Sequence, residues 1–205
     1  MDPHRITDLA TLEGLYGAPS EASLAKEVDH VHDLYRPFIE AAPFMVLATS
    51  GPDGLDTSPR GDAPGFVLVE DERTLLIPDR RGNNRTDSLR NLVTDPRVAL
   101  IFLVPGVGET LRVNGTAEIT VDPSLLARFV VDGKPPRSVL RVHVEAVYFQ
   151  CSKALVRSAL WNPDRHVDRQ RLPSSGTILA ALSNQKIGGP AYDAALPERV
   201  RATLY

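Results

Sequence analysis

The feature that most constrains this chain is a series of short strand-like runs between residues 44 and 151, with few helical segments between them. Turn residues such as Gly51-Pro52-Asp53-Gly54 separate neighbouring runs, as is typical of antiparallel hairpins. A parallel sheet would need a crossover helix after each strand, and those segments are missing. We therefore predict a mainly β, α+β fold, an antiparallel barrel of six to seven strands with flanking helices. The expected strands are 44–49, 55–58, 65–69, 74–78, 98–104, 110–120 and 139–151.

Helical patterns before and after the strands divide the chain into three parts. Ser20 and Ser23 are suitable N-caps for a helix that runs through Leu24 to Tyr35 with apolar residues three and four apart. We predict a helical segment at 1–43 packed on the barrel, the barrel at 44–162, and a C-terminal helical extension at 163–205. Shorter helices are expected at 85–93 and 123–131.

Composition narrows the classes of function. The 205 residues carry a net charge of −3, which argues against a general binder of nucleic acid or of anionic membranes. The single cysteine, Cys151, permits no disulfide within the chain, and no apolar run is long enough for a membrane-spanning helix. The polar first residues lack the apolar centre of a signal peptide, so we expect a cytoplasmic protein. No Cys-x-x-Cys or His-Glu-x-x-His string is present, and we expect no metal site.

The segment 77–90 gives the strongest indication of chemistry, because a strand, a Gly-Asn-Asn turn and a helix follow one another there. Glycine and asparagine tolerate positive φ, so successive N–H groups in this turn can converge on an anion, and the helix N-terminus adds partial positive charge. Guanidinium groups suited to phosphate come from Arg80, Arg81 and Arg85. A phosphate-binding loop is one interpretation, and a solvated basic turn with Asn84 as a helix cap is the other.

Two further segments have unusual backbones. In 56–65, two prolines and two glycines surround Arg60. One interpretation is that Arg60 faces a ligand or a partner, and the other is a β-bulge with Arg60 on the surface. In 110–118, Gly115 lies within a strand, where a barrel bend is the simpler interpretation.

Taken in this order, the segments resemble the pyridoxamine 5′-phosphate oxidase-like family of split β-barrels that bind flavin mononucleotide (FMN). The likeness is strongest to a flavin-nucleotide-binding subgroup of uncertain substrate. It covers about residues 35–162. The strings that carry it are Thr57-Ser58-Pro59-Arg60-Gly61-Asp62, Ile77-Pro78-Asp79-Arg80-Arg81-Gly82-Asn83-Asn84-Arg85, Glu109-Thr110-Leu111-Arg112-Val113-Asn114-Gly115 and Cys151-Ser152-Lys153-Ala154.

The resemblance implies a homodimer with FMN at the interface and each site built from both subunits. Residues in four places are implied to bind the cofactor: Ser58, Pro59, Arg60 and Gly61 along the ring and ribityl chain, Asp79, Arg80, Asn83, Asn84 and Arg85 near the ribityl and phosphate groups, Thr110 near the flavin, and Lys153 reaching across from the partner chain.

The activity implied is that of an FMN-dependent oxidoreductase acting on a small organic substrate, with NAD(P)H or oxygen as its partner. Residues 198–205 lack the Arg-containing strand motif with which the pyridoxamine phosphate oxidases end, so the likeness predicts the cofactor and not the substrate. Two alternatives stay open. The chain could be a non-catalytic flavin-binding carrier or sensor module, or a related barrel that uses F420 or haem. No catalytic side chain is assigned.

Overall fold

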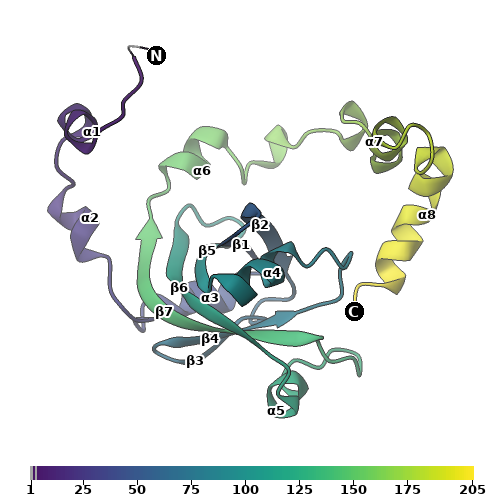
Figure 1. Cartoon of the computed structure of the whole chain (residues 1–205), viewed down its shortest axis with the longest axis horizontal. Helices are drawn as coiled ribbons and strands as arrows, with labels where there is room; N and C mark the ends of the chain where they lie inside the picture. Colours follow the sequence, from purple (N-terminus) through teal and green to yellow (C-terminus); the bar gives the residue numbers. More distant parts are fainter. Residues whose placement is uncertain (1, 3) are drawn as a thin grey trace.

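The computed structural model of the chain describes residue 2 and residues 4–205. Its strands form one antiparallel sheet in the order β2-β1-β5-β6-β7-β4-β3, which confirms the predicted mainly β fold with flanking helices (Figure 1). The strands are β1 (Phe44–Gly51), β2 (Gly54–Gly61), β3 (Leu68–Asp71), β4 (Thr74–Asp79), β5 (Arg97–Leu103), β6 (Thr110–Thr120) and β7 (Ser138–Gln150).

The helices lie at the two ends of the chain and between strands. They are α1 (Leu9–Tyr16), α2 (Glu21–Ala25), α3 (Arg36–Ala41), α4 (Asp87–Thr94), α5 (Pro123–Ala127), α6 (Lys153–Ser158), α7 (Ser175–Leu182) and α8 (Gly189–Ala202), with 3-10 turns at Pro163–Arg165 and Arg169–Arg171. None of the helices among the described residues is long and apolar enough to cross a membrane.

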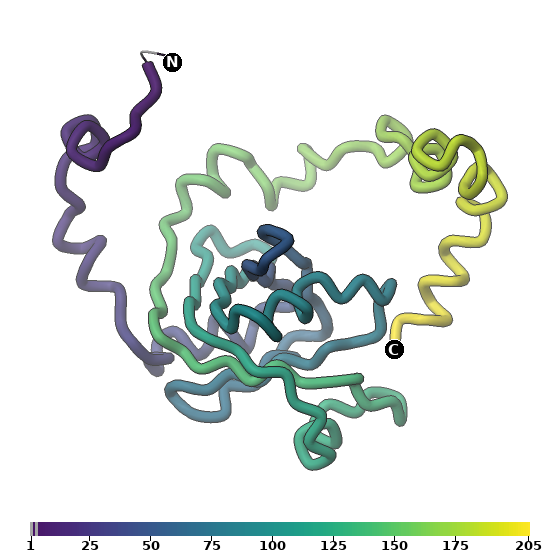
Figure 2. The backbone as a smooth tube through the Cα atoms, viewed as in Figure 1, coloured from purple at the N-terminus to yellow at the C-terminus, as the bar shows by residue number. Residues whose placement is uncertain are grey.

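The curled sheet encloses the main hydrophobic core, because alternate residues of β1, β5 and β6 point inward. In β1, for example, Met45 and Leu47 are fully buried, while Val46 between them is only partly buried. Leu100 of β5 and Val113 of β6 face the same interior. The helix α4 packs against β1 and so closes one side of this core (Figure 2).

The expected helix from Leu24 to Tyr35 is wrong. The structure has only the short helices α2 and α3 on either side of an irregular stretch. In that stretch Val28 forms a bridge with Val147 of β7, in which each N–H donates to the other residue's carbonyl at 3.0 and 2.7 Å. Pairing with the barrel therefore overrides the local helical spacing, and β-branched valine favours such extended pairing.

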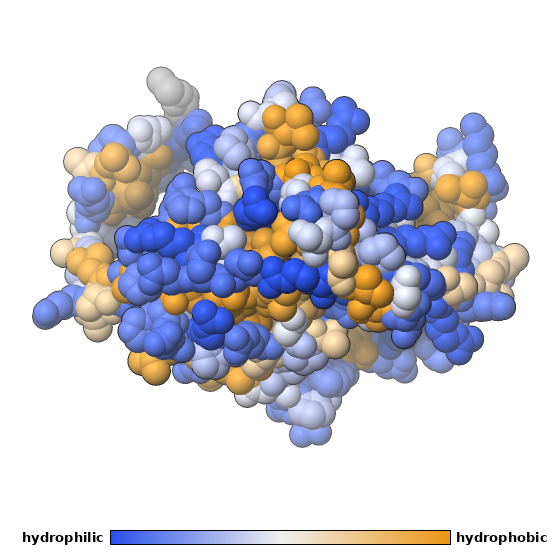
Figure 3. Space-filling view, turned by 90° about the horizontal axis from the view of Figure 1, so that it is seen from below, coloured by the Kyte–Doolittle hydropathy of each residue, from blue (hydrophilic) through white to orange (hydrophobic). Residues whose placement is uncertain are grey.

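The two ends of the chain lie beside the barrel rather than in its core. Neither α1 nor α2 contains a buried residue, and α1 stands apart from the sheet in Figure 1. The C-terminal helices α7 and α8 pack on each other, and the chain then returns to the barrel at its end. The space-filling view shows hydrophobic side chains reaching the surface between hydrophilic ones (Figure 3).

Candidate functional site

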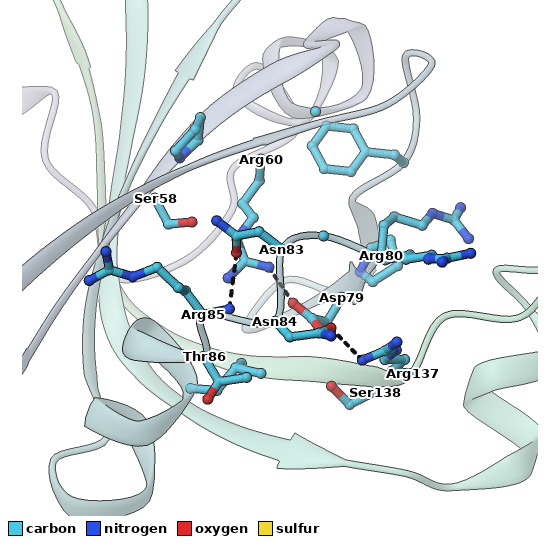
Figure 4. Close-up of a pocket in the computed structure, with 17 residues that line it drawn as sticks. Ser58, Arg60, Asp79, Arg80, Asn83, Asn84, Arg85, Thr86, Arg137 and Ser138 are labelled. Atoms are coloured by element: carbon cyan, nitrogen blue, oxygen red, sulfur yellow. Dashed lines mark hydrogen bonds and ion pairs between the residues drawn. The ribbon is translucent and has the colours of Figure 1, made fainter. Parts of the chain in front are cut away.

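A pocket of about 540 Å³ opens where β2 and β4 end, beside the loop that leads to α4 and the start of β7 (Figure 4). This volume is within the usual range of small-molecule sites. Most of the residues expected to bind a cofactor line it together, although β2 and β4 are not neighbours in the sheet. These residues are Ser58, Pro59, Arg60, Gly61, Asp79, Arg80, Asn83, Asn84 and Arg85.

Two predicted residues lie outside this pocket. Thr110 is buried at the start of β6, where it is paired with Gln150 of β7. Lys153 is exposed at the first position of α6, shortly after the same end of β7. The two are therefore near each other in the fold, but in a single chain they do not join the pocket.

Arg60 and Asp79 form a charged pair in the pocket wall. Nη1 of Arg60 donates to Oδ1 of Asp79, and the two side chains are only 17% and 15% exposed. The Nε of Arg60 is buried and has no hydrogen-bond partner among the described residues. A buried, unsatisfied donor is costly unless a ligand or water accepts from it. The atom therefore indicates a place where a bound acceptor would be stabilised.

Arg80 lines the pocket, but its guanidinium group is already bound. Its Nε donates to Oδ2 of Asp62 at 2.8 Å, and its Nη1 donates to the carbonyl of Phe129 at 2.5 Å. The Oδ1 of Asp62 also accepts from the hydroxyl of Tyr205 at 2.7 Å. Burial alone would raise the pKa of Asp62, but the hydrogen bonds from Tyr205 and Ala63 and the neighbouring Arg80 lower it overall. The role of Arg80 is therefore mainly to hold the edge of the pocket in place, because its Nε and Nη1 already donate within the protein.

The Gly-Asn-Asn turn has the left-handed residue that the sequence indicated, but only at one position. Asn84 has a φ of 62°, whereas Gly82 is not among the positive-φ residues. The side-chain oxygen of Asn83 accepts from the N–H of Arg85 at 3.0 Å. Thr86, rather than Asn84, is the N-cap of α4, and no side chain caps this helix. The first N–H groups of α4 therefore remain free to face an anion.

Arg137 is a pocket residue that the sequence reasoning missed. It precedes β7, and its Nη1 donates to Oδ1 of Asn84 at 2.8 Å (Figure 4). Pro135 and Pro136 immediately before it mark a fixed loop, but no local periodicity links that loop to residues 53 positions earlier. Within the described residues, no group of three or more His, Cys, Asp or Glu side chains is placed to hold a metal ion.

The fold and the pocket define the class to which the chain belongs, the split β-barrels, here with a basic corner between a strand and a helix. A family model described as pyridoxamine 5′-phosphate oxidase matches residues 31–151, which is more than half of the chain. The chain therefore belongs to the pyridoxamine 5′-phosphate oxidase family, as the sequence resemblance predicted. The comparison with curated proteins found no match.

Several solved structures are similar to this chain. HupZ of Group A Streptococcus is 17% identical, with 59% of this chain and 94% of that chain covered and a TM-score of 0.49. General Stress Protein 26 of Bacillus anthracis is 14% identical, with 56% and 88% covered and a TM-score of 0.44. An F420 reductase is 23% identical, with 57% and 98% covered and a TM-score of 0.43.

Proposed function

We propose that this protein binds FMN in the pocket between β2, β4 and α4 and serves as an oxidoreductase for a small organic substrate. The observation that carries the proposal is the basic corner from Asp79 to Thr86, which opens into a pocket of about 540 Å³. Family membership supports a flavin, and the pocket residues fit a flavin nucleotide in three separate respects.

The first respect concerns the end of the pocket where the phosphate group of the nucleotide would bind. The left-handed Asn84 and the uncapped start of α4 offer N–H groups to an anion. The second is the buried and unpartnered Nε of Arg60, which requires an acceptor such as a flavin oxygen or nitrogen. The third is the apolar side chain of Phe66, which lines the same pocket and gives a surface for part of a planar ring system.

When bound, FMN supplies hydride transfer through its isoalloxazine ring, and the protein binds and orients it. In this proposal Ser58, Pro59 and Gly61 contact the ring and ribityl chain from β2. Arg60 would stabilise negative charge on the reduced ring, helped by Lys153 of the second subunit. The strand position of Arg60 and its pairing with Asp79 keep the guanidinium in place before the ligand arrives.

We further propose that the working unit is a homodimer. Thr110 and Lys153 lie outside the pocket of their own chain, so the family likeness is satisfied only if they complete the site of a second subunit. Size-exclusion chromatography with light scattering tests this directly, with a dimer mass expected and a monomer mass contradicting it.

The experiment that tests the proposal is titration of cofactor-free protein with FMN, in which binding is measured by calorimetry and by the flavin absorption band. NAD(P)H is then added under anaerobic conditions. Saturable FMN binding and bleaching by a donor support the full proposal. Bound flavin that no donor reduces favours a carrier or sensor module. Protein that takes up no FMN but binds F420 or haem contradicts the cofactor assignment.

A further inference from the structure

Five arginines line the pocket, and they come from three separate segments of the chain: Arg60 from β2, Arg80, Arg81 and Arg85 from the loop before α4, and Arg137 from the residue just before β7. A phosphate monoester carries about 1.5 to 2 negative charges at pH 7. Which of the five can meet that charge depends on the carboxylates that already neutralise them.

Two of the arginines are neutralised inside the protein. Arg60 is paired with Asp79, and both side chains are more than four-fifths buried. Arg80 is paired with Asp62, whose side chain is 5% exposed. Removing either arginine from its carboxylate to bind a ligand would leave a buried charge unpaired, which is strongly unfavourable. These two arginines therefore add little net charge for the phosphate, whereas the unpartnered Nε of Arg60 can still donate to the flavin ring.

Arg85 is also paired, but at the surface. Its Nε lies 2.9 Å from Oδ2 of Asp87, and the two side chains are 77% and 46% exposed. The pair is weak because water screens it, yet Asp87 stays beside any phosphate that Arg85 would hold. The negative charge of Asp87 cancels much of what Arg85 offers.

Arg81 and Arg137 have no carboxylate partner among the described residues. The side chain of Arg137 is bound only through the neutral amide oxygen of Asn84, at 2.8 Å. Its backbone is fixed on both sides: its N–H donates to the carbonyl of Asp79 at 3.1 Å, and Ser138, which follows it, is paired with Asp79 in the sheet. The guanidinium is therefore held beside the left-handed Asn84, with four of its five N–H donors still available.

We propose that Arg137 and Arg81 supply the charge that makes this pocket select a terminal phosphate monoester, and that Arg137 contributes through its own charge as well as through Asn84. Counting all five arginines against Asp79, Asp62 and Asp87, five positive charges less three negative leaves +2, which matches a phosphate dianion. The inference rests on the proposed FMN site and reassigns the phosphate contacts within it.

The test compares the affinities of FMN and riboflavin, which differ only by the phosphate, in the wild type and in single variants of the full chain. We expect Arg137→Ala to weaken FMN binding about ten- to hundredfold and riboflavin binding less than about twofold. Arg81→Ala is expected to act in the same direction. Arg85→Ala should also weaken FMN binding, because it leaves the carboxylate of Asp87 unpaired beside the phosphate, but its effect should be smaller than that of Arg137→Ala because water screens this exposed pair.

Two controls keep the result interpretable. Arg141→Ala removes an exposed arginine four residues further along β7, where it is paired with Glu118 outside the pocket, and should leave both affinities unchanged. Asn84→Gly retains the left-handed backbone but removes the oxygen that Arg137 binds. If Arg137→Ala has no effect in the Asn84→Gly background, Arg137 merely positions Asn84, and the proposal is overturned.

Failure of the proposed FMN site and failure of the Arg137 assignment would give different results. If the wild type binds neither FMN nor riboflavin, the proposed function itself is wrong. If the wild type binds FMN more tightly than riboflavin, and Arg137→Ala keeps that preference while melting at the wild-type temperature, only the assignment of Arg137 is wrong. A variant that loses both ligands equally and melts earlier counts against the assignment too, because a charge contact must affect FMN selectively.

Discussion

Tyr205 connects the end of the chain to the pocket's edge, and its hydroxyl is the atom to remove first. The hydroxyl donates to Oδ1 of Asp62 at 2.7 Å, and the Arg80 guanidinium lies 5.4 Å from the ring centre. Lys134 donates to the Tyr205 carbonyl oxygen at 3.2 Å. Among the described residues, these are the hydrogen bonds that join 166–205 to the barrel. Tyr205→Phe therefore tests whether one side chain holds the whole C-terminal extension.

The expected magnitude follows from what the substitution leaves behind. A hydrogen bond to a charged group contributes about 1.5–3 kcal/mol. Oδ1 of Asp62 keeps the N–H of Ala63 at 2.8 Å and Oδ2 keeps Arg80, so the carboxylate is not left unsatisfied. The loss should thus be near the lower limit, about 1.5 kcal/mol, or roughly a tenfold larger undocked population of the extension.

Limited trypsin digestion measures that population, because cleavage follows the open fraction when opening and closing are fast. Exposed arginines within 163–171 provide the cleavage sites. We expect cleavage there to be about tenfold faster in Tyr205→Phe, with the barrel still intact. Tyr192→Phe is the matched control, since it removes another hydroxyl from the same extension at a residue whose ring contacts Arg199. Equal cleavage rates in the wild type and Tyr205→Phe would refute the reasoning.

The pH dependence of the same contact has a definite sign. The folded-state pKa of Asp62 is lowered from its ordinary value of 3.8, so its contribution to stability is present above that value and is lost as the pH falls through the folded-state pKa. Protection of the extension in the wild type should therefore be constant near neutral pH and decline below about pH 4. Tyr205→Phe should reach the unprotected state at a higher pH, since it removes one of the interactions that lower the pKa.

Two further predictions concern the barrel and the pocket wall. Gly115→Ala should lower the free energy of unfolding by about 3 kcal/mol or more, measured with denaturant, because the added Cβ would lie 2.0 Å from the carbonyl oxygen of His143. The control Gly14→Ala, whose added Cβ would have nothing within 4 Å, should be neutral or mildly stabilising. Similar losses of stability in both variants would contradict this prediction. Asp79→Asn should lower the free energy of unfolding by about 3 kcal/mol, because it leaves the buried charge of Arg60 unpaired. It should also strengthen the binding of inorganic phosphate, because the charge of Arg60 then adds to the net positive charge of the pocket. Weaker phosphate binding would show that the charge count is wrong.

Much of the barrel could be predicted from local sequence. Hairpin turns such as 51–54 and the alternation in β1 depend on neighbouring residues, so the strands were placed to within a few positions. The same holds for the corner before α4, because the tolerance of Asn84 for positive φ is a property of the residue itself. The segment around Val28 failed because its conformation depends on pairing with Val147, far away in the sequence.

By itself, then, the sequence determined a chain of antiparallel strands and a basic, asparagine-containing corner, at which we propose that a phosphate binds. Only the tertiary structure decided which arginines are available there. The partners that neutralise Arg60 and Arg80 lie 19 and 18 residues away, and the contact that brings in Arg137 spans 53. The charge of a side chain is fixed by its type, but the net field in a pocket depends on which opposite charges the fold places within a few ångströms.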